Sequence, residues 1–423
     1  MPTRIWLAGE AMTEPNDDDD LEQLRNVERA DVFKSGARAA ILTRTDGGVQ
    51  FRYLPDWISA GNPPVATTLP VTGDPVLRPG GALPAYFTGL LPEGRRLGAL
   101  RRAVKTSADD ELTLLLAVGA DAIGDVQVTP AGVTPAEVPA QVSLQQVGDI
   151  TFADLLVDLG IRAQRSALPG VQDKTSAAMI NLPIARAGER YILKLNPAEY
   201  PNLVENEAFF LEAARRSGLS VPPSELVYDA ENRPGLLVRR FDRTTVDGAM
   251  HLRAVEDGCQ VLNRPPADKY LVGTDRTFAA LAAVCDAATL AARDLVSQLV
   301  FAYLTGNGDA HAKNFSVLQE EDGEWRVSPT YDVPSSYPYG DTTMALSIGG
   351  RSGGDFGADD FVGLGGRLGV PERAVRRVLA DLRERVDSWL VALDDLPFDP
   401  GRITKLRRVV EYRRRRLTPP SGT

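Results

Sequence analysis

One segment in the C-terminal half of the chain constrains the possible folds more than any other. Asp294–Leu304 repeats apolar residues at intervals of three and four, which predicts a buried helix. Gly306 and Gly308 follow and are expected to end this helix, because glycine accepts the backbone conformations that helix ends require. The polar stretch Asp309–Asn314 is then expected to form a loop directly after a buried helix.

The residues after this loop predict a β-hairpin. Phe315–Leu318 is a short apolar strand, Glu320–Gly323 is a turn, and Trp325–Val327 is the returning strand. A hairpin of this kind brings Asp332 back beside the loop that carries Asp309 and Asn314. Three oxygen-bearing side chains are therefore expected to converge on one site.

The residue types at this site suit phosphoryl transfer. That reaction needs one carboxylate to orient and deprotonate a hydroxyl, plus an amide oxygen and a second carboxylate to hold Mg²⁺. We therefore predict that Asp309 is the base and that Asn314 and Asp332 are magnesium ligands. The alternative is a helix-capping Asp, a turn Asn and an unrelated Asp in a polar loop, and the triplet alone does not decide between the two.

A glycine-bearing turn with polar and basic residues lies upstream, at Ala167–Ser176, and leads into the apolar stretch Ala177–Ile180. Such a loop can offer backbone N–H groups to phosphate oxygens. It lacks the spacing of a Walker A loop. We expect it to contact the phosphates of a nucleotide.

A single lysine, Lys194, interrupts the strand-like apolar run Tyr191–Leu195. Burial of an ammonium group normally requires an anionic partner. In protein kinases the partners of such a lysine are the ATP phosphates and a helix glutamate. Glu207 lies on a predicted amphipathic helix just downstream and is the candidate partner. The alternative is that Lys194 lies on an edge strand and extends its ammonium into water.

Taken together, these residues resemble the HipA-type serine/threonine protein kinases, which are toxins of bacterial toxin–antitoxin pairs. The likeness covers nearly the whole chain, and the matches at the catalytic loop and the lysine strand are specific. The segments that carry it are Tyr86–Glu93, Pro169–Lys174, Ile192–Leu195, Asn206–Glu207, Arg239–Arg243, Glu256–Gln260, Gly308–Ser316 and Pro329–Asp332.

The resemblance implies the same roles for Asp309, Asn314 and Asp332, and implies that Lys194 contacts ATP phosphates. His311 could equally be a structural hydrogen-bonding residue. The further nucleotide contacts that it implies are Pro169, Gly170, Val171, Gln172, Asp173 and Lys174 in the phosphate loop, Arg239, Arg240 and Phe241 at the hinge, and His311 and Lys313 in the catalytic loop.

The sequence departs from the HipA pattern at one place and from the pattern of eukaryotic protein kinases at two. Similar family members can autophosphorylate a serine just before the phosphate loop, but here Ala167 occupies the expected register and Ser166 is displaced by one position. Autophosphorylation of Ser166 is therefore a hypothesis. No His-Arg-Asp precedes the base, and Val333-Pro334 follows Asp332 in place of Phe-Gly. Both features are normal for HipA-like chains and argue against a eukaryotic-type kinase.

The length of 423 residues is enough for two or three domains. We predict an N-terminal module at residues 1–130, a proline-rich connector at 131–144, a strand-rich lobe with one helix at 145–240 and a mainly helical lobe at 241–423. The fold class is α+β, with two kinase-like lobes, an additional N-terminal α+β module, and ATP in the cleft between the lobes. Leu112–Val118 and Ala374–Leu382 are predicted core helices.

The composition limits the cellular compartment and the binding partners that we expect for this chain. Cys259 and Cys285 give neither a disulfide framework nor zinc spacing, which fits a reducing cytoplasm. No apolar stretch reaches the ~18 residues of a membrane helix, so we expect no membrane association. The net charge of −10 argues against autonomous nucleic-acid binding. The basic stretch Arg402–Arg416 is either a docked C-terminal helix, which we favour, or a phosphate-contacting surface.

The sequence therefore predicts an ATP- and Mg²⁺-dependent serine/threonine protein kinase of the HipA-like toxin type. The resemblance implies that its target is a translation component such as an aminoacyl-tRNA synthetase, and that phosphorylation arrests growth. It also implies a helix-turn-helix antitoxin as partner, with DNA contacted only through that antitoxin. Two other classes stay open: a kinase-fold scaffold or co-repressor that acts through the antitoxin, and a small-molecule kinase.

Overall fold

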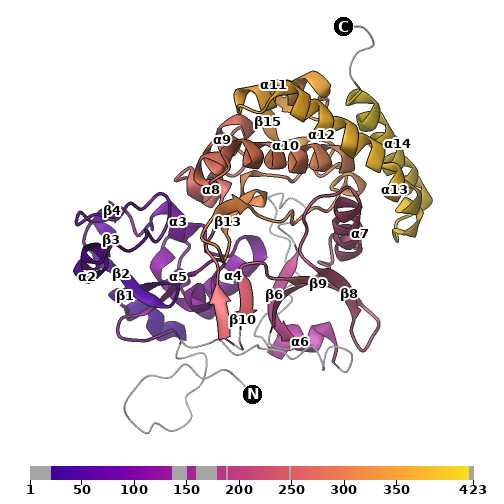
Figure 1. The fold of residues 1–423 in the computed structure, drawn as a ribbon. Coiled ribbons are helices and arrows are strands. Elements are labelled where there is room, and N and C mark those ends of the chain that lie inside the picture. Colours follow the sequence, from indigo (N-terminus) through magenta and orange to yellow (C-terminus); the bar gives the residue numbers. More distant parts are fainter. Residues whose placement is uncertain (1–20, 136–149, 159–178, 187–188, 247–248, 419–423) are drawn as a thin grey trace.

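The computed structural model describes residues 21–135, 150–158, 179–186, 189–246 and 249–418. It confirms the predicted α+β class with two lobes and an N-terminal module (Figure 1). The predicted phosphate loop Pro169–Lys174 and Ser166 lie outside the described residues, as does the connector beyond residue 135. Within the described ranges, no helix is both long enough and apolar enough to span a bilayer.

The N-terminal module is built on an antiparallel sheet with the strand order β4-β3-β2-β1-β5. Alternate residues such as Val32, Leu42 and Phe51 are buried beneath the predicted core helix α5. The strands are β1 (Arg29–Lys34), β2 (Ala37–Thr45), β3 (Gly48–Tyr53), β4 (Val76–Arg78) and β5 (Val126–Pro130), and the helices are α2 (Pro55–Ser59), α3 (Ala85–Thr88), α4 (Gly94–Ala103) and α5 (Glu111–Val118).

The strand-rich lobe is a second antiparallel sheet, with the order β6-β7-β9-β8. Successive side chains of a strand point to opposite faces, so Leu193 and Leu195 pack with helix α6 while Lys194 between them faces the other side. The lobe contains α6 as well as the one helix that was predicted. The elements are β6 (Ile180–Arg186), β7 (Glu189–Leu195), β8 (Ser224–Tyr228), β9 (Pro234–Arg239), α6 (Phe152–Asp158) and α7 (Leu203–Arg216).

The helical lobe surrounds α10, which spans Ala288–Thr305 and confirms the predicted buried helix. Its buried residues, including Leu295 and Leu299, join the largest hydrophobic core, which also takes in α7 of the other lobe. The other helices are α8 (Gly258–Val261), α9 (Thr274–Val284), α11 (Ala358–Arg367), α12 (Glu372–Arg385), α13 (Asp387–Leu390) and α14 (Pro400–Arg416).

Short strands complete the two lobes. The predicted hairpin is present as β13 and β14, with Val317 paired to Val327, and β12 adds a third strand beside β13. The strands are β10 (Arg243–Val246), β11 (Ala249–Leu252), β12 (Val255–Asp257), β13 (Ser316–Gln319), β14 (Trp325–Val327), β15 (Met344–Ile348) and β16 (Arg351–Gly353). The 3-10 turns are η1 (Leu24–Asn26), η2 (Gly119–Asp121), η5 (Pro266–Asp268), η6 (Ala312–Asn314), η7 (Tyr337–Tyr339) and η8 (Val391–Asp395).

The basic C-terminal helix α14 is docked onto the helical lobe, as we favoured. Its apolar residues Ile403, Leu406 and Val410 are buried in the main core. Arg413 is buried as well and donates hydrogen bonds to the carbonyl oxygens of Tyr303 and Thr342 at 2.7 and 3.0 Å. The docked helix is therefore confirmed, while a phosphate-contacting role for its exposed arginines stays a prediction.

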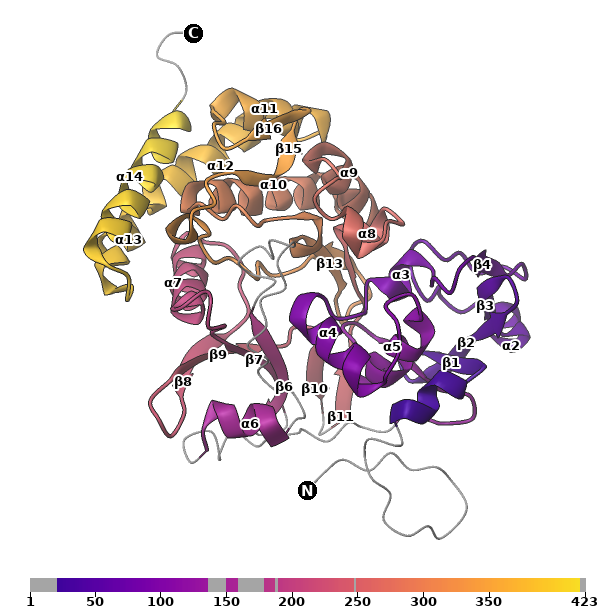
Figure 2. The same cartoon turned by 180° about the vertical axis from the view of Figure 1, so that it is seen from behind.

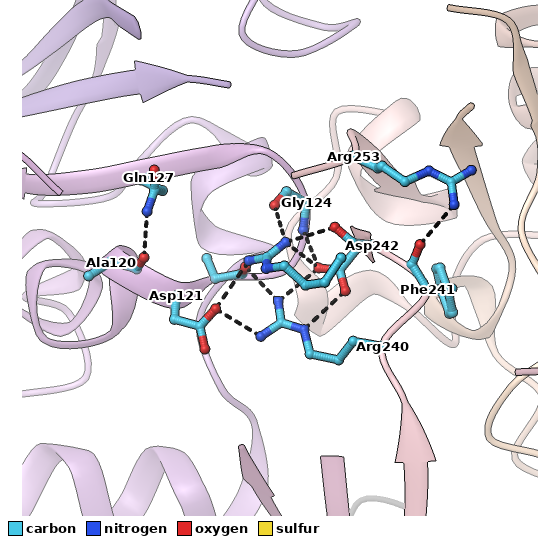
Figure 3. Close-up of polar contacts among 10 residues, drawn as sticks. Ala120, Asp121, Gly124, Gln127, Arg240, Phe241, Asp242 and Arg253 are labelled. Carbon is cyan, nitrogen blue, oxygen red and sulfur yellow. Dashed lines mark hydrogen bonds and ion pairs between the residues drawn. The ribbon is translucent and has the colours of Figure 1, made fainter. Parts of the chain in front are cut away.

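The N-terminal module lies against the junction of the two lobes in both views (Figures 1 and 2). A buried ion network joins it to the segment that follows β9. The guanidinium of Arg240 donates to Asp121 at 2.9 Å and to Asp242 at 2.8 and 3.0 Å, as Figure 3 shows. Arg243 donates to Asp242 at 2.8 Å and to the carbonyl oxygens of Ala122 and Gly124. Two cations and two anions from separate parts of the chain therefore neutralise one another, with Arg240, Asp242 and Arg243 buried and Asp121 partly exposed.

Replacement of Asp242 by alanine is expected to lower the free energy of unfolding by about 3–5 kcal/mol, because Arg240 and Arg243 would stay buried with Asp121 as their remaining carboxylate. Urea denaturation followed by circular dichroism measures the change. Arg377→Ala is the control, since the Arg377–Asp381 pair on α12 is exposed and should be worth less than about 1 kcal/mol. Equal losses for the two variants would contradict the prediction.

The same variant tests a pH dependence. Burial alone would raise the pKa of Asp242, but Arg240 and Arg243 outweigh burial and hold that pKa below its usual range. A carboxyl whose pKa is lower in the folded than in the unfolded chain stabilises the fold above its unfolded pKa of about 3.9, and this stabilisation is lost as the pH falls toward the folded value. The stability difference between wild type and Asp242→Ala should therefore stay constant from about pH 8 to 5 and shrink below that range.

Candidate active site

The predicted catalytic loop begins where α10 ends. Gly306 has the left-handed φ of 72° at the helix C-terminus, and its carbonyl oxygen accepts a hydrogen bond from the backbone N–H of Ser336 at 3.0 Å. The N–H of Gly308 donates to the Ser336 hydroxyl at 2.7 Å. A Cβ at Gly308 would lie 2.7 Å from that same oxygen, so this close approach requires glycine. The segment after Asp332 therefore fixes the start of the loop.

Asp332 returns beside the loop, as the hairpin predicted. Its Oδ2 accepts a hydrogen bond from Nδ2 of Asn314 at 2.7 Å, and its backbone oxygen accepts one from Nδ2 of Asn307 at 3.3 Å. The φ of Asp332 is 55°, a left-handed value that is uncommon outside glycine and costs of the order of 1–3 kcal/mol. Surrounding contacts hold the residue in this conformation, which is typical of functional sites.

Lys194 meets two carboxylates from different lobes. Its Nζ lies 2.7 and 2.9 Å from the two carboxylate oxygens of Glu207 on α7, and 3.3 Å from Oδ1 of Asp332. Strand β7 lies between β6 and β9, and Lys194 is 9% exposed, so the alternative of an edge-strand lysine that reaches water is wrong. Burial alone would lower the pKa of the ammonium, but Glu207 and Asp332 outweigh burial and raise that pKa. Lys194 is therefore a fixed positive charge.

The four groups that the sequence singled out lie together. Asp332 contacts Lys194 through one carboxylate oxygen and Asn314 through the other. Asn307 connects Asp332 to the base, because its Nδ2 donates to the Asp332 carbonyl and its Oδ1 accepts from the N–H of Asp309 at 3.0 Å. Hydrogen bonds therefore join the Lys194 ammonium, the Asp332 carboxylate and the Asn314 amide directly, and join the backbone of Asp309 to that of Asp332 through Asn307.

Tyr270 is a site residue that the sequence did not reveal. Its hydroxyl donates a hydrogen bond to Oδ1 of Asp309 at 2.7 Å. Burial, and next the charge of Asp309, raise the pKa of Tyr270, so the hydroxyl stays protonated and remains a donor. The ring also packs edge-on against His311, with 5.1 Å between ring centroids. No periodicity or spacing in the sequence connects Tyr270 with a loop almost forty residues later.

Asn206 was noted in the sequence only as part of a motif, and the structure gives it a structural role. Its side-chain amide donates to the carbonyl oxygen of Ser335 at 2.8 Å and accepts from the N–H of Ser335 at 3.0 Å. Asn206 is fully buried on α7, next to Glu207. This pair of hydrogen bonds joins the helix that carries Glu207 to the segment that carries Asp332.

The other predicted nucleotide contacts lie in different surroundings. The Lys313 ammonium turns toward Asp257, at 2.6 Å, and toward the carbonyl oxygen of Gly89, at 3.1 Å. His311 is buried, and its backbone N–H donates to Oδ1 of Asn314 at 3.0 Å. Because the main chain makes this hydrogen bond, the role of the His311 imidazole stays a prediction.

At the predicted hinge, the side chains also have partners within the protein. Arg239 pairs with Glu189 at 2.5 Å, and Arg240 belongs to the ion network with Asp121. The ring of Phe241 lies 5.6 Å from that of Tyr331. Contacts to a nucleotide from Arg239 and Arg240 would therefore have to come from the backbone as long as these ion pairs persist.

Comparison with known protein families gives two matches that together span most of the chain. Residues 166–390 match the model described as the HipA-like C-terminal domain, and residues 30–129 match the HipA N-terminal domain.

Two curated proteins illustrate the sequence similarity. A Sinorhizobium fredii protein named "Putative kinase Y4mE" is 32% identical over 383 residues, which cover 84% of this chain and 90% of the relative. The serine/threonine-protein kinase toxin HipA of Shewanella oneidensis is 27% identical over 322 residues, which cover 70% of this chain and 72% of the relative.

A solved structure shares the fold. The chain superposes with a TM-score of 0.73 and 21% identity on a structure of a toxin–antitoxin system of Shewanella oneidensis MR-1, described as the complex of HipA, HipB and operator DNA. The superposition covers 92% of this chain and 97% of the other. At this level of identity the match supports the fold.

Glu207→Gln is expected to lower the free energy of unfolding by about 1–3 kcal/mol, because it removes the nearer of the two charges that face the buried Lys194. Urea denaturation measures the change. Glu212→Gln on the same helix is the matched control, since Glu212 is exposed and pairs only with exposed arginines in the described residues, and its effect should stay within about 0.5 kcal/mol. If Glu207→Gln were as stable as this control, the Lys194–Glu207 pair would not stabilise the fold.

Proposed function

Since this chain belongs to the HipA family, we propose that it is an ATP- and Mg²⁺-dependent serine/threonine protein kinase and the toxin of a toxin–antitoxin pair. The observation that carries the proposal is the hydrogen-bonded grouping of the Lys194, Asp332 and Asn314 side chains, with the backbone of Asp309 joined to it through Asn307. The kinase names of the relatives support the same reaction class.

In the proposed mechanism Asp309 accepts the proton of the substrate hydroxyl. The hydrogen bond from Tyr270 favours the ionised carboxylate that this step needs, and it also fixes the direction in which Oδ1 points. The Lys194 ammonium would form ion pairs with the ATP phosphates, and Glu207 would hold the ammonium in position. Catalysis would thus rest on orientation and on charges that are already in place.

Asn314 and Asp332 would hold magnesium, and their chemistry fits this ion. Both offer oxygen, and magnesium sites in kinases usually combine one or two carboxylates with substrate phosphates. Within the part of the chain that the structure describes, the amide oxygen of Asn314 accepts a hydrogen bond from the backbone N–H of His311, and an amide oxygen has a second lone pair. No three His, Cys, Asp or Glu side chains of the described residues gather around one point, so phosphate and water oxygens would complete the coordination. The bound ion would offset negative charge on the transferred phosphoryl group.

The remaining nucleotide contacts in this proposal come from the family pattern. Pro169–Lys174 would cover the phosphates with backbone N–H groups. The backbone of Arg239–Phe241 would contact the adenine, since the side chains of both arginines are held by Glu189, Asp121 and Asp242.

We further propose a cytoplasmic protein substrate that belongs to the translation machinery, such as an aminoacyl-tRNA synthetase, whose phosphorylation arrests growth. A helix-turn-helix antitoxin would be the regulatory partner. The Shewanella structure described as HipA, HipB and operator DNA supports such an assembly. The net charge of −10 favours contact with DNA through the antitoxin over direct binding.

Two alternatives make different predictions for the same assay. Incubation with radiolabelled ATP, a cell lysate and a metabolite panel would label a protein band if the chain is a protein kinase. A labelled metabolite would identify a small-molecule kinase. Absence of ATP turnover would favour a kinase-fold scaffold or co-repressor that acts through the antitoxin.

Asp309→Ala and Asp332→Ala are each expected to abolish phosphorylation, with a loss of at least about 100-fold, while the fold is retained, because one removes the base and the other a magnesium ligand. Expression of wild type and Asp309→Ala in a bacterium, with growth and the phosphoproteome read together, tests activity, toxicity and target. Asp381→Ala, an exposed acid on α12, is the control and should behave as wild type. Wild-type turnover by Asp309→Ala would show that the base is a different residue.

Ser166 is proposed as a site of autophosphorylation, because a phosphate there would alter the adjoining phosphate loop. Intact-protein and peptide mass spectrometry after incubation with ATP should show one added phosphate on the peptide that contains Ser166, and Ser166→Ala should lack it. Asp309→Ala should also lack it, since the reaction depends on the base. Modification at other residues alone, or none, would count against this proposal.

A further inference from the structure

A carboxylate of the N-terminal module reaches the catalytic loop. Glu93 directly precedes α4, the helix labelled in Figure 2. Its Oε2 lies 2.5 Å from Nζ of Lys269, and its Oε1 lies 3.7 Å from Nζ of Lys313. Lys313 belongs to the catalytic loop, and Lys269 immediately precedes Tyr270. One side chain thus contacts both segments that meet at the base.

The Lys269–Tyr270 segment holds the catalytic loop through three separate contacts. The carbonyl oxygen of Lys269 accepts a hydrogen bond from the N–H of Ala312 at 3.2 Å. The Tyr270 hydroxyl donates to Asp309, and its ring packs against His311. A shift of this segment would therefore move the residues on both sides of Asp309.

The ammonium groups beside Glu93 are shielded from water. The side chains of Lys269 and Lys313 are 12% and 14% exposed. Lys313 has a second carboxylate partner in Asp257 at 2.6 Å, whereas Glu93 is the one carboxylate that pairs with Lys269 in the described part of the chain. Partly buried pairs of this kind restrict geometry more than exposed ion pairs do. Loss of the Glu93 charge would free Lys269 and leave Lys313 paired with Asp257.

We propose that the N-terminal module positions the catalytic base, with Glu93 tethering Lys269 and Lys313 so that the Tyr270 hydroxyl stays on Asp309. This inference rests on the proposed kinase function. Glu93 and Tyr270 are positioning residues in it, because neither transfers a proton or contacts the phosphoryl group. The module is then a part of the working active site in addition to any role in binding partners.

The first test compares steady-state kinetics of Glu93→Gln with those of wild type. We expect kcat to fall about tenfold while KM for ATP stays within about twofold, because the base is displaced and the Lys194 site is untouched. Glu93→Asp keeps the charge and should recover part of kcat. Arg78→Ala is the matched control, since Arg78 also links the module to the core, through Asn263 at 3.4 Å, but lies away from the loop. Its kinetics should equal those of wild type.

A double-mutant cycle tests whether Glu93 acts through Tyr270. If both residues act on Asp309 by one route, the double variant Glu93→Gln/Tyr270→Phe should lose less activity than the product of the two single losses. Lys269→Gln removes the other end of the ion pair and should reproduce Glu93→Gln, which keeps the test valid if Glu93→Gln folds poorly.

Hydrogen exchange without ATP separates this inference from the proposed function. Peptides that cover 266–272 and 309–315 should exchange faster in Glu93→Gln than in wild type or Arg78→Ala, with the rest of the chain unchanged. Wild type that transfers no phosphate would refute the proposed function, and the exchange result would still decide whether the module holds the loop. Exchange and kcat of Glu93→Gln equal to those of Arg78→Ala would overturn the inference.

Discussion

The rest of the site depends on the ion pairs that the buried ammonium of Lys194 forms with two carboxylates. Its partners come from both lobes, Glu207 from α7 and Asp332 from the segment after the hairpin. Glu207 offsets most of the cost of burying this charge and Asp332 adds to it from the other lobe, so the ion pairs favour one relative placement of the lobes. The hydrogen bonds between Asn206 and Ser335 stabilise the same placement without charge. The relative placement of the lobes that neutralises Lys194 is therefore the same placement that allows the hydrogen bonds between Asn206 and Ser335.

In the described residues, ion pairs join the N-terminal module to the lobes at two separate places. Asp121 meets Arg240 and Arg243 near the hinge, and Glu93 meets Lys269 and Lys313 near the catalytic loop. A module that contacts both segments restrains the predicted hinge and the catalytic loop together, as the proposed positioning role of Glu93 requires.

Local patterns predicted the elements whose residues are neighbours in sequence. The helix α10, the hairpin β13–β14 and the strand that carries Lys194 follow from apolar spacing, and their order brings Asp332 to the loop. Other contacts join residues that are far apart in the sequence, and no apolar spacing in the sequence indicates them. Tyr270 and Asp309 are 39 positions apart, and Glu93 and Lys269 are 176 apart. Only the packing of whole modules brings these side chains together, and helix or strand periodicity carries no information about it.

The backbone of Asp332 has a consequence for which residues can occupy this position. A left-handed φ is tolerated by glycine and, among residues with side chains, best by asparagine and aspartate. Glycine would bring no ligand, and asparagine would bring an uncharged amide beside an ammonium. Backbone geometry and charge thus select the same amino acid independently. Exchange of Asp332 for asparagine would therefore keep the backbone conformation and remove the negative charge.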